Sequence, residues 1–93
     1  MKIEFAKTYR LSLLVQVLYI AKDKPLAARK FRKDIIRNIK KDLVNPFHFK
    51  KSIYYEEENI RDYVFKGYTS VYKIDIENQT ITVFGFIKHK ETL

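Results

Sequence analysis

The amino-acid sequence predicts one α+β domain spanning residues 1–93, in which a helical hairpin packs on one face of a sheet. Apolar residues recur at helical spacing in two neighbouring segments of the first half, and polar and apolar residues alternate in the last third. Only two glycines and two prolines interrupt the chain. The expected order is an N-terminal strand, an antiparallel helical hairpin and a three-stranded antiparallel meander, with all strands in one sheet.

The first fifth of the chain predicts a short strand and then a helix. Residues 2–5 alternate polar and apolar, which is typical of a half-buried strand. Thr8 is the expected N-cap, because its hydroxyl can accept from free amides of the first turn. The helix is apolar on two faces, so we expect one face to be covered by another element or another chain. The first face comprises Leu11, Leu14, Val15 and Leu18, and the second comprises Leu13, Val17 and Ile20.

A second helix is predicted from Pro25, because proline is tolerated in a first turn, where its missing N–H would be unpaired. Asn45-Pro46 ends it. Residues 22–25 form a tight connection, so the two helices should run antiparallel. One stripe of the second helix is apolar and contains Ala28, Phe31, Ile35, Ile39 and Leu43.

The rest of the chain predicts an unassigned linker and three strands. Residues 47–59 mix aromatic, basic and acidic side chains without a period. Strands are expected over residues 60–65, 69–76 and 81–88, with Gly67 in the first turn and a polar second turn at 77–79. The sequence leaves open whether the N-terminal strand lies at the edge or the centre of the sheet.

The net charge of +8 is concentrated in one segment. Residues 22–51 hold eleven basic and three acidic side chains, so the remainder of the chain is neutral. Such concentration points to an anionic partner, either nucleic acid or an acidic protein. The residues expected to contact nucleic acid are Arg37, Lys40 and Lys41 of the basic helix, with Lys73 and Lys88 of the strands.

Composition also limits the compartment and the chemistry. The chain has no cysteine, which excludes disulfides and cysteine-ligated metals, and we expect neither a metal nor a small-molecule cofactor. The apolar run at 11–21 is too short to span a bilayer. Although it resembles a signal peptide, Glu4 and the charged residues 22–24 do not fit one, so we interpret the run as core and expect a cytoplasmic protein without a membrane partner.

One group of side chains could carry chemistry. His89 stands between Lys88 and Lys90 at the end of the last strand. A lysine that holds a phosphate beside an imidazole that moves a proton makes RNA cleavage through the 2′-hydroxyl chemically feasible. The alternative is a solvated basic tail. His48, in a loop among aromatic residues, is interpreted as an ordinary loop histidine.

Residues 60–74, Ile-Arg-Asp-Tyr-Val-Phe-Lys-Gly-Tyr-Thr-Ser-Val-Tyr-Lys-Ile, resemble the RelE/ParE toxin superfamily. Its recurrent string is a strand starting with arginine, then Gly-Tyr, Val-Tyr and a polar–apolar alternation. A polar turn, an apolar strand and a basic or histidine-bearing end follow, here residues 84–90. The segment 27–31 and Asn45-Pro46 fit the same layout. The resemblance covers nearly the whole chain.

This resemblance implies the toxin of a type II toxin–antitoxin system, of the kind associated with plasmid stabilisation, with a small acidic antitoxin as partner. It acts either by ribosome-dependent mRNA cleavage or by poisoning DNA gyrase. The alternatives are an inactive relative and an unrelated basic nucleic-acid-binding domain. The antitoxin is expected on Leu13, Val17 and Ile20.

The match to the RNA-cleaving branch of the superfamily is incomplete. Where that branch places an arginine after Gly-Tyr, this chain has Thr69, and the chain has no aromatic residue after its C-terminal histidine. If the chain is a nuclease, the catalytic set implied is Arg61, Lys66 and Lys90 on the phosphate and His89 on the proton. Whether the chain is an enzyme stays open.

Overall fold

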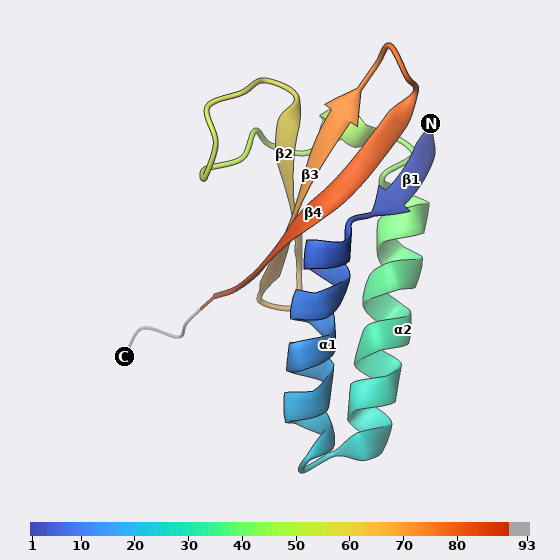
Figure 1. The fold of residues 1–93 in the computed structure, drawn as a ribbon, viewed down its shortest axis with the longest axis vertical. Helices are drawn as coiled ribbons and strands as arrows, with labels where there is room; N and C mark the ends of the chain where they lie inside the picture. Colours follow the sequence, from blue (N-terminus) through green and yellow to red (C-terminus); the bar gives the residue numbers. More distant parts are fainter. Residues whose placement is uncertain (90–93) are drawn as a thin grey trace.

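In the computed structural model, which describes residues 1–89, two antiparallel helices lie beside one four-stranded sheet (Figure 1). The order of elements matches the order predicted from the sequence. The elements are β1 (Lys2–Phe5), α1 (Lys7–Ala21), α2 (Pro25–Asp42), a short 3₁₀ turn (Pro46–His48), β2 (Ile60–Phe65), β3 (Tyr68–Asp75) and β4 (Thr80–Lys88).

The sheet has the strand order β1-β4-β3-β2. Strands β2, β3 and β4 form the predicted antiparallel meander, and β1 adds to its edge parallel to β4, with Lys2 opposite Thr80. The sheet is therefore mixed, and the place of the N-terminal strand, which the sequence left open, is the edge. Both helices lie toward the same side of the sheet, and the lower part of the hairpin extends past it (Figure 1).

A two-residue turn joins β2 to β3. Lys66 and Gly67 both have positive φ, 50° and 81°, as a hairpin turn that matches the strand twist requires. Glycine adopts this conformation without strain, which explains the position of Gly67 in the sequence. The turn fixes the register in which Phe65 lies opposite Tyr68.

The core lies between the helices and the sheet. Helix α2 contributes Ile35 and Ile39, and Leu43 follows at its end; all three are fully buried, as the apolar stripe predicted. Each buried aliphatic side chain of this size stabilises the fold by about 1.5–3 kcal/mol relative to an exposed one. The remaining members of the core cluster are Tyr9 and Leu13 of α1 and Tyr63, Tyr72, Ile74, Ile81 and Val83 of the sheet.

The predicted N-cap of α1 is wrong. Ala6 occupies the N-cap position and no side chain caps the helix. Pairing of β1 with β4 extends to the Ala6 amide, which donates to the Val83 carbonyl at 2.8 Å, and this contact starts the helix at Lys7. Thr8 consequently lies inside the first turn, where its hydroxyl donates to the Phe84 carbonyl of β4 at 3.1 Å.

The unassigned linker is organised by long-range hydrogen bonds. The Arg61 guanidinium donates to the carbonyls of Phe49 at 2.8 Å and Glu58 at 3.0 Å. The Tyr72 hydroxyl, at 2.5 Å, donates to the carbonyl of Pro46. At its far end the Ile74 amide donates to the carbonyl of Asn59 at 2.8 Å. The linker is thus attached to β2 and β3 at several points.

Candidate functional site

Helix α1 presents an exposed apolar stripe, made of Leu11, Leu14, Val15 and Leu18 and referred to below as the α1 stripe. Its members are between 46% and 68% exposed. The opposite face turns inward. Leu13 is 3% exposed and Val17 packs against the core cluster, while Ile20 is half-buried.

This arrangement corrects the face that the sequence analysis assigned to the antitoxin. Leu13 already contacts the core and, at 3% exposed, offers a partner very little surface. The two faces of α1 are similarly apolar, and the position of the sheet decides which is free. The α1 stripe is the free face.

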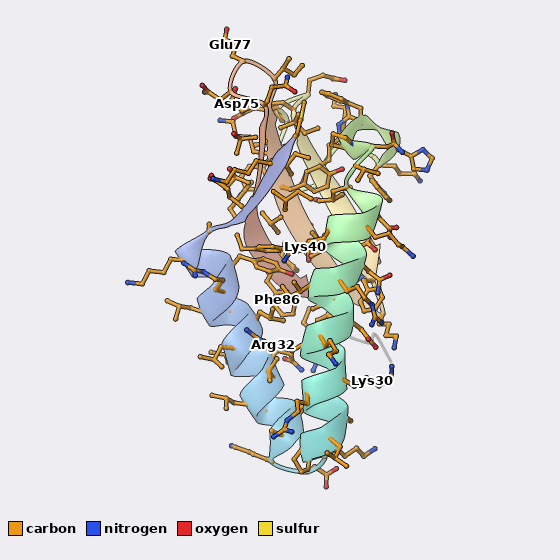
Figure 2. The ribbon with its side chains drawn as sticks, turned by 90° about the vertical axis from the view of Figure 1, so that its right-hand side faces the viewer. Lys30, Arg32, Lys40, Asp75, Glu77 and Phe86 are labelled. Carbon is orange, nitrogen blue, oxygen red and sulfur yellow. The ribbon has the colours of Figure 1, made fainter. Side chains whose placement is uncertain are left out.

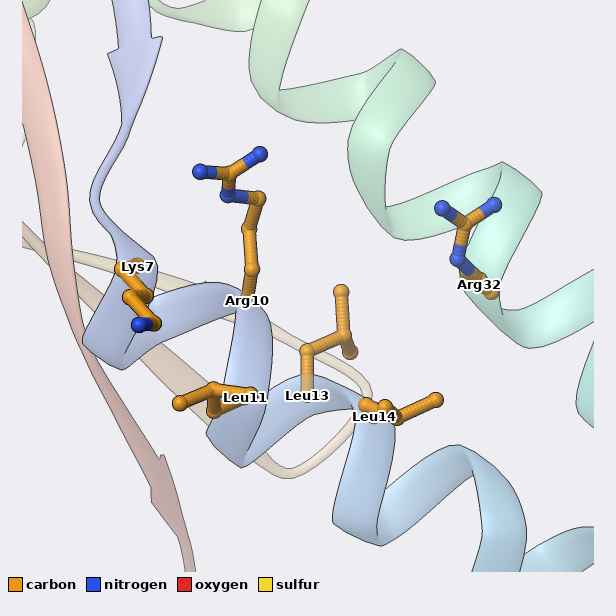
Figure 3. A pocket seen from close by; sticks show the side chains of 6 residues that line it. All are labelled: Lys7, Arg10, Leu11, Leu13, Leu14 and Arg32. Carbon is orange, nitrogen blue, oxygen red and sulfur yellow. The ribbon is translucent and has the colours of Figure 1, made fainter.

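A groove of about 400 Å³ lies between the hairpin helices, beside the N-terminal end of the α1 stripe (Figure 3). Arg10 and Leu13 of α1 point toward α2, from which Arg32 projects (Figure 3). Lys7, Leu11 and Leu14 complete its lining. The groove therefore combines an apolar floor with three cationic side chains and has no acidic residue in its lining.

The outer surface of α2 is strongly basic. Arg32 lies on the side of α2 that faces α1 and Lys30 lies on the opposite side (Figure 2). A hollow of about 550 Å³ on this surface is lined by Arg29, Arg32, Lys33, Ile36, Arg37 and Lys40.

One buried acid interrupts the positive charge of α2. Asp34 is 6% exposed and accepts from Lys30 at 2.9 Å and from Arg37 at 2.7 Å. The Lys30 hydrogen bond is the main cause that lowers the pKa of Asp34, and the charges of Lys30, Arg37 and Lys66 act in the same direction. Arg37 is therefore partly neutralised.

The fold brings only some of the residues predicted to contact nucleic acid close together. Arg37 and Lys40 line the same hollow on α2, and Lys41 follows on that helix. Lys73 lies opposite Thr82, whereas Lys88 lies opposite Tyr68, five residues away along β3. The Lys88 ammonium is placed 5.4 Å from the ring centroid of Tyr19 on α1.

The predicted catalytic set does not meet at one point. Side chains alternate between the faces of a strand, so Arg61 shares the helix-facing side of β2 with the core residue Tyr63. His89 bonds Thr69, which pairs with Val64 on the opposite side. Arg61 and His89 are thus on opposite faces of the sheet and cannot bind one phosphate together.

The other two members of that set also differ from the expectation. Lys66 sits in the β2–β3 turn with its ammonium 5.5 Å from the ring centroid of Phe65, and its charge acts on Asp34 of α2. Its side chain therefore belongs to the helix-facing side as well. Lys90 lies outside the described residues.

A second hollow, about 490 Å³ in volume and called the histidine hollow below, is formed by residues of the linker, β2, β3 and the residue after β4. Both histidines of the chain line it, and the sequence analysis had set His48 aside. The Thr69 hydroxyl and His89 Nε2 are 2.5 Å apart, which orients the imidazole. The full lining is His48, Phe49, Lys50, Lys51, Ile53, Asp62, Val64, Thr69 and His89.

Among residues 1–89, no group of three or more histidine, aspartate or glutamate side chains is arranged to hold a metal ion. Within the same range, none of the helices has the length and apolar character needed to cross a membrane.

The family model of the ParE toxin of type II toxin–antitoxin systems, parDE, matches residues 3–93. The chain belongs to the ParE toxin family.

The fold agrees with this family. A solved structure described as the chromosomal ParDE toxin–antitoxin system from P. aeruginosa superposes with a TM-score of 0.74, covering 97% of each chain at 13% identity. No curated protein sequence matches the chain. The fold class and the superfamily resemblance noted from the sequence are both confirmed.

As a ParE-family toxin, the chain has two surfaces that differ in chemistry. The α1 stripe and its groove are apolar with a cationic rim, while the histidine hollow carries titratable groups. The sequence indicated both apolar faces of α1 without choosing the free one, and it did not place His48 beside His89. The free face of α1 depends on where the sheet lies, and His48 approaches His89 only because the linker folds back along β2.

Proposed function

We propose that this ParE-family chain arrests growth as the toxin of a toxin–antitoxin pair and is neutralised when an acidic antitoxin segment binds the α1 stripe. The observation that carries the proposal is the α1 stripe itself, which is up to 68% exposed on a chain of only 93 residues. Exposed apolar patches of this kind mark interaction sites in soluble proteins.

The positive charge around the groove favours an acidic partner. Helix α1 contains no acidic residue, and Lys7, Arg10 and Arg32 surround the groove beside the stripe. An amphipathic segment with an apolar face and flanking carboxylates would fill the groove and pair with these cations. A second copy of the same chain would bring like charges together.

A matched pair of substitutions tests this surface. Leu18→Glu places a carboxylate on the α1 stripe, and Leu26→Glu makes the same change on α2 at a side chain that is 78% exposed and does not belong to the stripe. We expect Leu18→Glu to weaken antitoxin binding about 100-fold, since a buried unpaired charge costs several kcal/mol. Leu26→Glu should leave binding unchanged.

The measurement is titration of each purified variant with the small acidic protein encoded beside the toxin gene. In cells, the Leu18→Glu toxin should continue to arrest growth when that protein is co-expressed. Equal neutralisation of both variants would mean that the antitoxin binds elsewhere.

For the cellular target, we propose DNA gyrase rather than messenger RNA. The superfamily resemblance offers both, and the arrangement of the predicted phosphate ligands favours gyrase. The donors of Arg61 are engaged by linker carbonyls, and the position after Gly-Tyr holds Thr69, which is 2% exposed. The Arg61 guanidinium is therefore not free to hold a scissile phosphate, and Thr69 has no guanidinium to offer.

A supercoiling assay tests this target. Purified protein should inhibit supercoiling of relaxed plasmid by gyrase and leave cleaved DNA after denaturation of the complex. The Leu26→Glu variant should behave like the unaltered chain. Full gyrase activity at a large molar excess of toxin would rule the target out.

Messenger RNA cleavage remains the second candidate because His89 lies in the histidine hollow beside Lys50 and Lys51. A ribosome-containing translation reaction, followed by primer extension, detects it. New 5′ ends that appear only with ribosomes, and that vanish in His89→Ala, would move the assignment to RNA cleavage.

A further inference from the structure

The middle of the linker differs in charge from the rest of the molecule. Residues 52–60 contain three of the chain's eleven acidic side chains and no basic one. Glu58 Oε2 lies 3.0 Å from the Lys51 ammonium, so this carboxylate is partly neutralised. Glu56 and Glu57 are exposed, and neither forms an ion pair within residues 1–89. In a chain of net charge +8, the linker therefore presents negative charge to solvent.

Apolar side chains next to this charge are open to solvent. Ile53 is 83% exposed, the largest fraction for any large apolar side chain in the described part of the molecule. Tyr54, Tyr55 and Val64 are exposed as well. Ile53 and Val64 line the same hollow, so the linker and β2 contribute to one continuous surface. These four side chains are called the linker patch below.

The linker patch is held in place although its side chains are exposed. The Ile53 amide donates to Asp62 Oδ2 of β2 at 3.1 Å. The Tyr55 ring lies edge-on to the Phe84 ring of β4, with the ring centroids 5.5 Å apart. A surface that is ordered before binding loses less conformational entropy when its partner arrives. The linker patch is thus an exposed apolar surface of defined shape, which is typical of an interaction site.

The linker patch lies apart from the α1 stripe. The linker is the yellow-green loop beside β2, whereas the free end of the hairpin extends past the opposite end of the sheet (Figure 1). The charges beside the two surfaces are also opposite. Lys7, Arg10 and Arg32 line the groove beside the α1 stripe, and Glu56 and Glu57 follow the linker patch along the chain. An acidic segment that fits the groove is therefore repelled by the linker.

We propose that the linker patch is the surface through which the toxin binds its target, a protein that presents an apolar pocket edged by lysine and arginine side chains. This inference rests on the proposed function, in which the target is gyrase. Ile53 and Tyr54 enter the apolar pocket, and Glu56 and Glu57 pair with the basic edge. Apolar and aromatic anchors inside a polar rim are the usual composition of a protein–protein interface. The same two glutamates would repel a nucleic-acid target.

The first test compares matched apolar substitutions by titration with gyrase and with the antitoxin. Ile53→Ser should weaken gyrase binding about tenfold, because an anchoring side chain loses its apolar contact. Binding of the antitoxin should be unchanged, which also shows that the variant is folded. Leu26→Ser removes a similarly exposed apolar side chain from the tip of the hairpin and should change neither affinity.

The second test isolates the charge of the linker. The double variant Glu56→Gln/Glu57→Gln keeps the size of both side chains and should weaken gyrase binding about fivefold at low ionic strength. The difference from the unaltered chain should shrink at high ionic strength, because salt screens exposed charges. Asp23→Asn, which removes an exposed carboxylate at the tip of the hairpin, should leave the affinity unchanged.

Growth arrest separates this inference from the choice of gyrase as the target. If the unaltered chain fails to bind gyrase, that target is wrong, and loss of growth arrest in Ile53→Ser with normal antitoxin binding would assign the linker patch to another protein target. Growth arrest by Ile53→Ser at the same expression level as the unaltered chain would overturn the inference. Weaker antitoxin binding in Ile53→Ser would also overturn it, as would a sedimentation change showing that the patch contacts a second copy.

Discussion

The two helices of the hairpin differ in how their side chains are divided between core and solvent. Helix α2 has one apolar stripe, most of which is buried, and its remaining surface is mainly cationic. Helix α1 is apolar on both sides, and only Tyr9 and Leu13 are buried. Both buried residues lie in its first half, beside the sheet, while the second half extends along α2 beyond the sheet (Figure 1).

This difference separates residues that maintain the fold from residues that await a partner. The apolar stripe of α2 lies in the core or packs against it, whereas the α1 stripe belongs to neither group. A helix that served stability alone would carry polar side chains on its outer face. The α1 stripe is therefore a functional surface whose substitution should affect binding more than folding.

The largest effect on stability is expected in the buried stripe of α2. Ile39→Ala should lower the free energy of unfolding by about 3 kcal/mol, because it removes three carbons from a fully buried side chain and leaves a cavity. Urea unfolding followed by circular dichroism measures it. Leu26→Ala, at an exposed position of the same helix, is the control. A loss below 1 kcal/mol for Ile39→Ala would break the contrast between the helices.

The same contrast explains how far the sequence predicted the fold. Helix α2 was predicted because its pattern has one apolar face, and strands β2 to β4 were predicted because alternating residues lie between turn residues. For α1, periodicity found the helix, but two apolar faces gave no basis for choosing the buried one. That choice depends on β1 pairing with β4, a contact between the two ends of the chain.

A smaller loss of stability is expected from a substitution at the contact between α1 and the sheet. The Tyr9 hydroxyl and the Ser70 hydroxyl are 2.8 Å apart in the core, and burial raises the pKa of Tyr9 to about 12. Tyr9→Phe should cost about 1–2 kcal/mol, since Ser70 loses its buried partner. Urea unfolding measures the change, and the double variant Tyr9→Phe/Ser70→Ala should recover part of the loss. An additive double variant would show that the pair does not hold α1.

Of the two helices, only α2 should contribute to the loss of stability at low pH, because α1 has no carboxylate. Hydrogen bonding to Lys30 lowers the pKa of Asp34 in the folded chain. The unfolded chain therefore takes up the proton first as the pH falls. The stabilisation is complete above about pH 5, falls as the pH drops through the unfolded pKa, and is gone below the folded pKa.

Asp34→Asn should flatten this dependence. The urea midpoint of the unaltered chain should fall between pH 5 and pH 3, and that of Asp34→Asn should fall less. Glu58 and Asp75, whose pKa values are also lowered, account for the remainder. An unchanged slope in Asp34→Asn would assign the acid sensitivity to the sheet and linker instead.

The candidate sites were harder to predict than the fold, for a physical reason. Linker residues 47–59 have no period because their structure comes from Arg61, Tyr72 and Asn59, which bind backbone groups distant in sequence. Arg61 was predicted to bind phosphate and instead supports the linker. His48 was set aside, yet the supported linker places it in the same hollow as His89.

The smallest effect on stability is expected on the α1 stripe. Leu18→Ser should change the free energy of unfolding by less than about 0.5 kcal/mol, because the side chain is 57% exposed and lies outside the core cluster. Binding of the hydrophobic dye ANS to the isolated chain should decrease in the same variant. If Leu18→Ser instead destabilised the chain as much as Ile39→Ala, the stripe would be part of the core, and the case for a partner on α1 would fail.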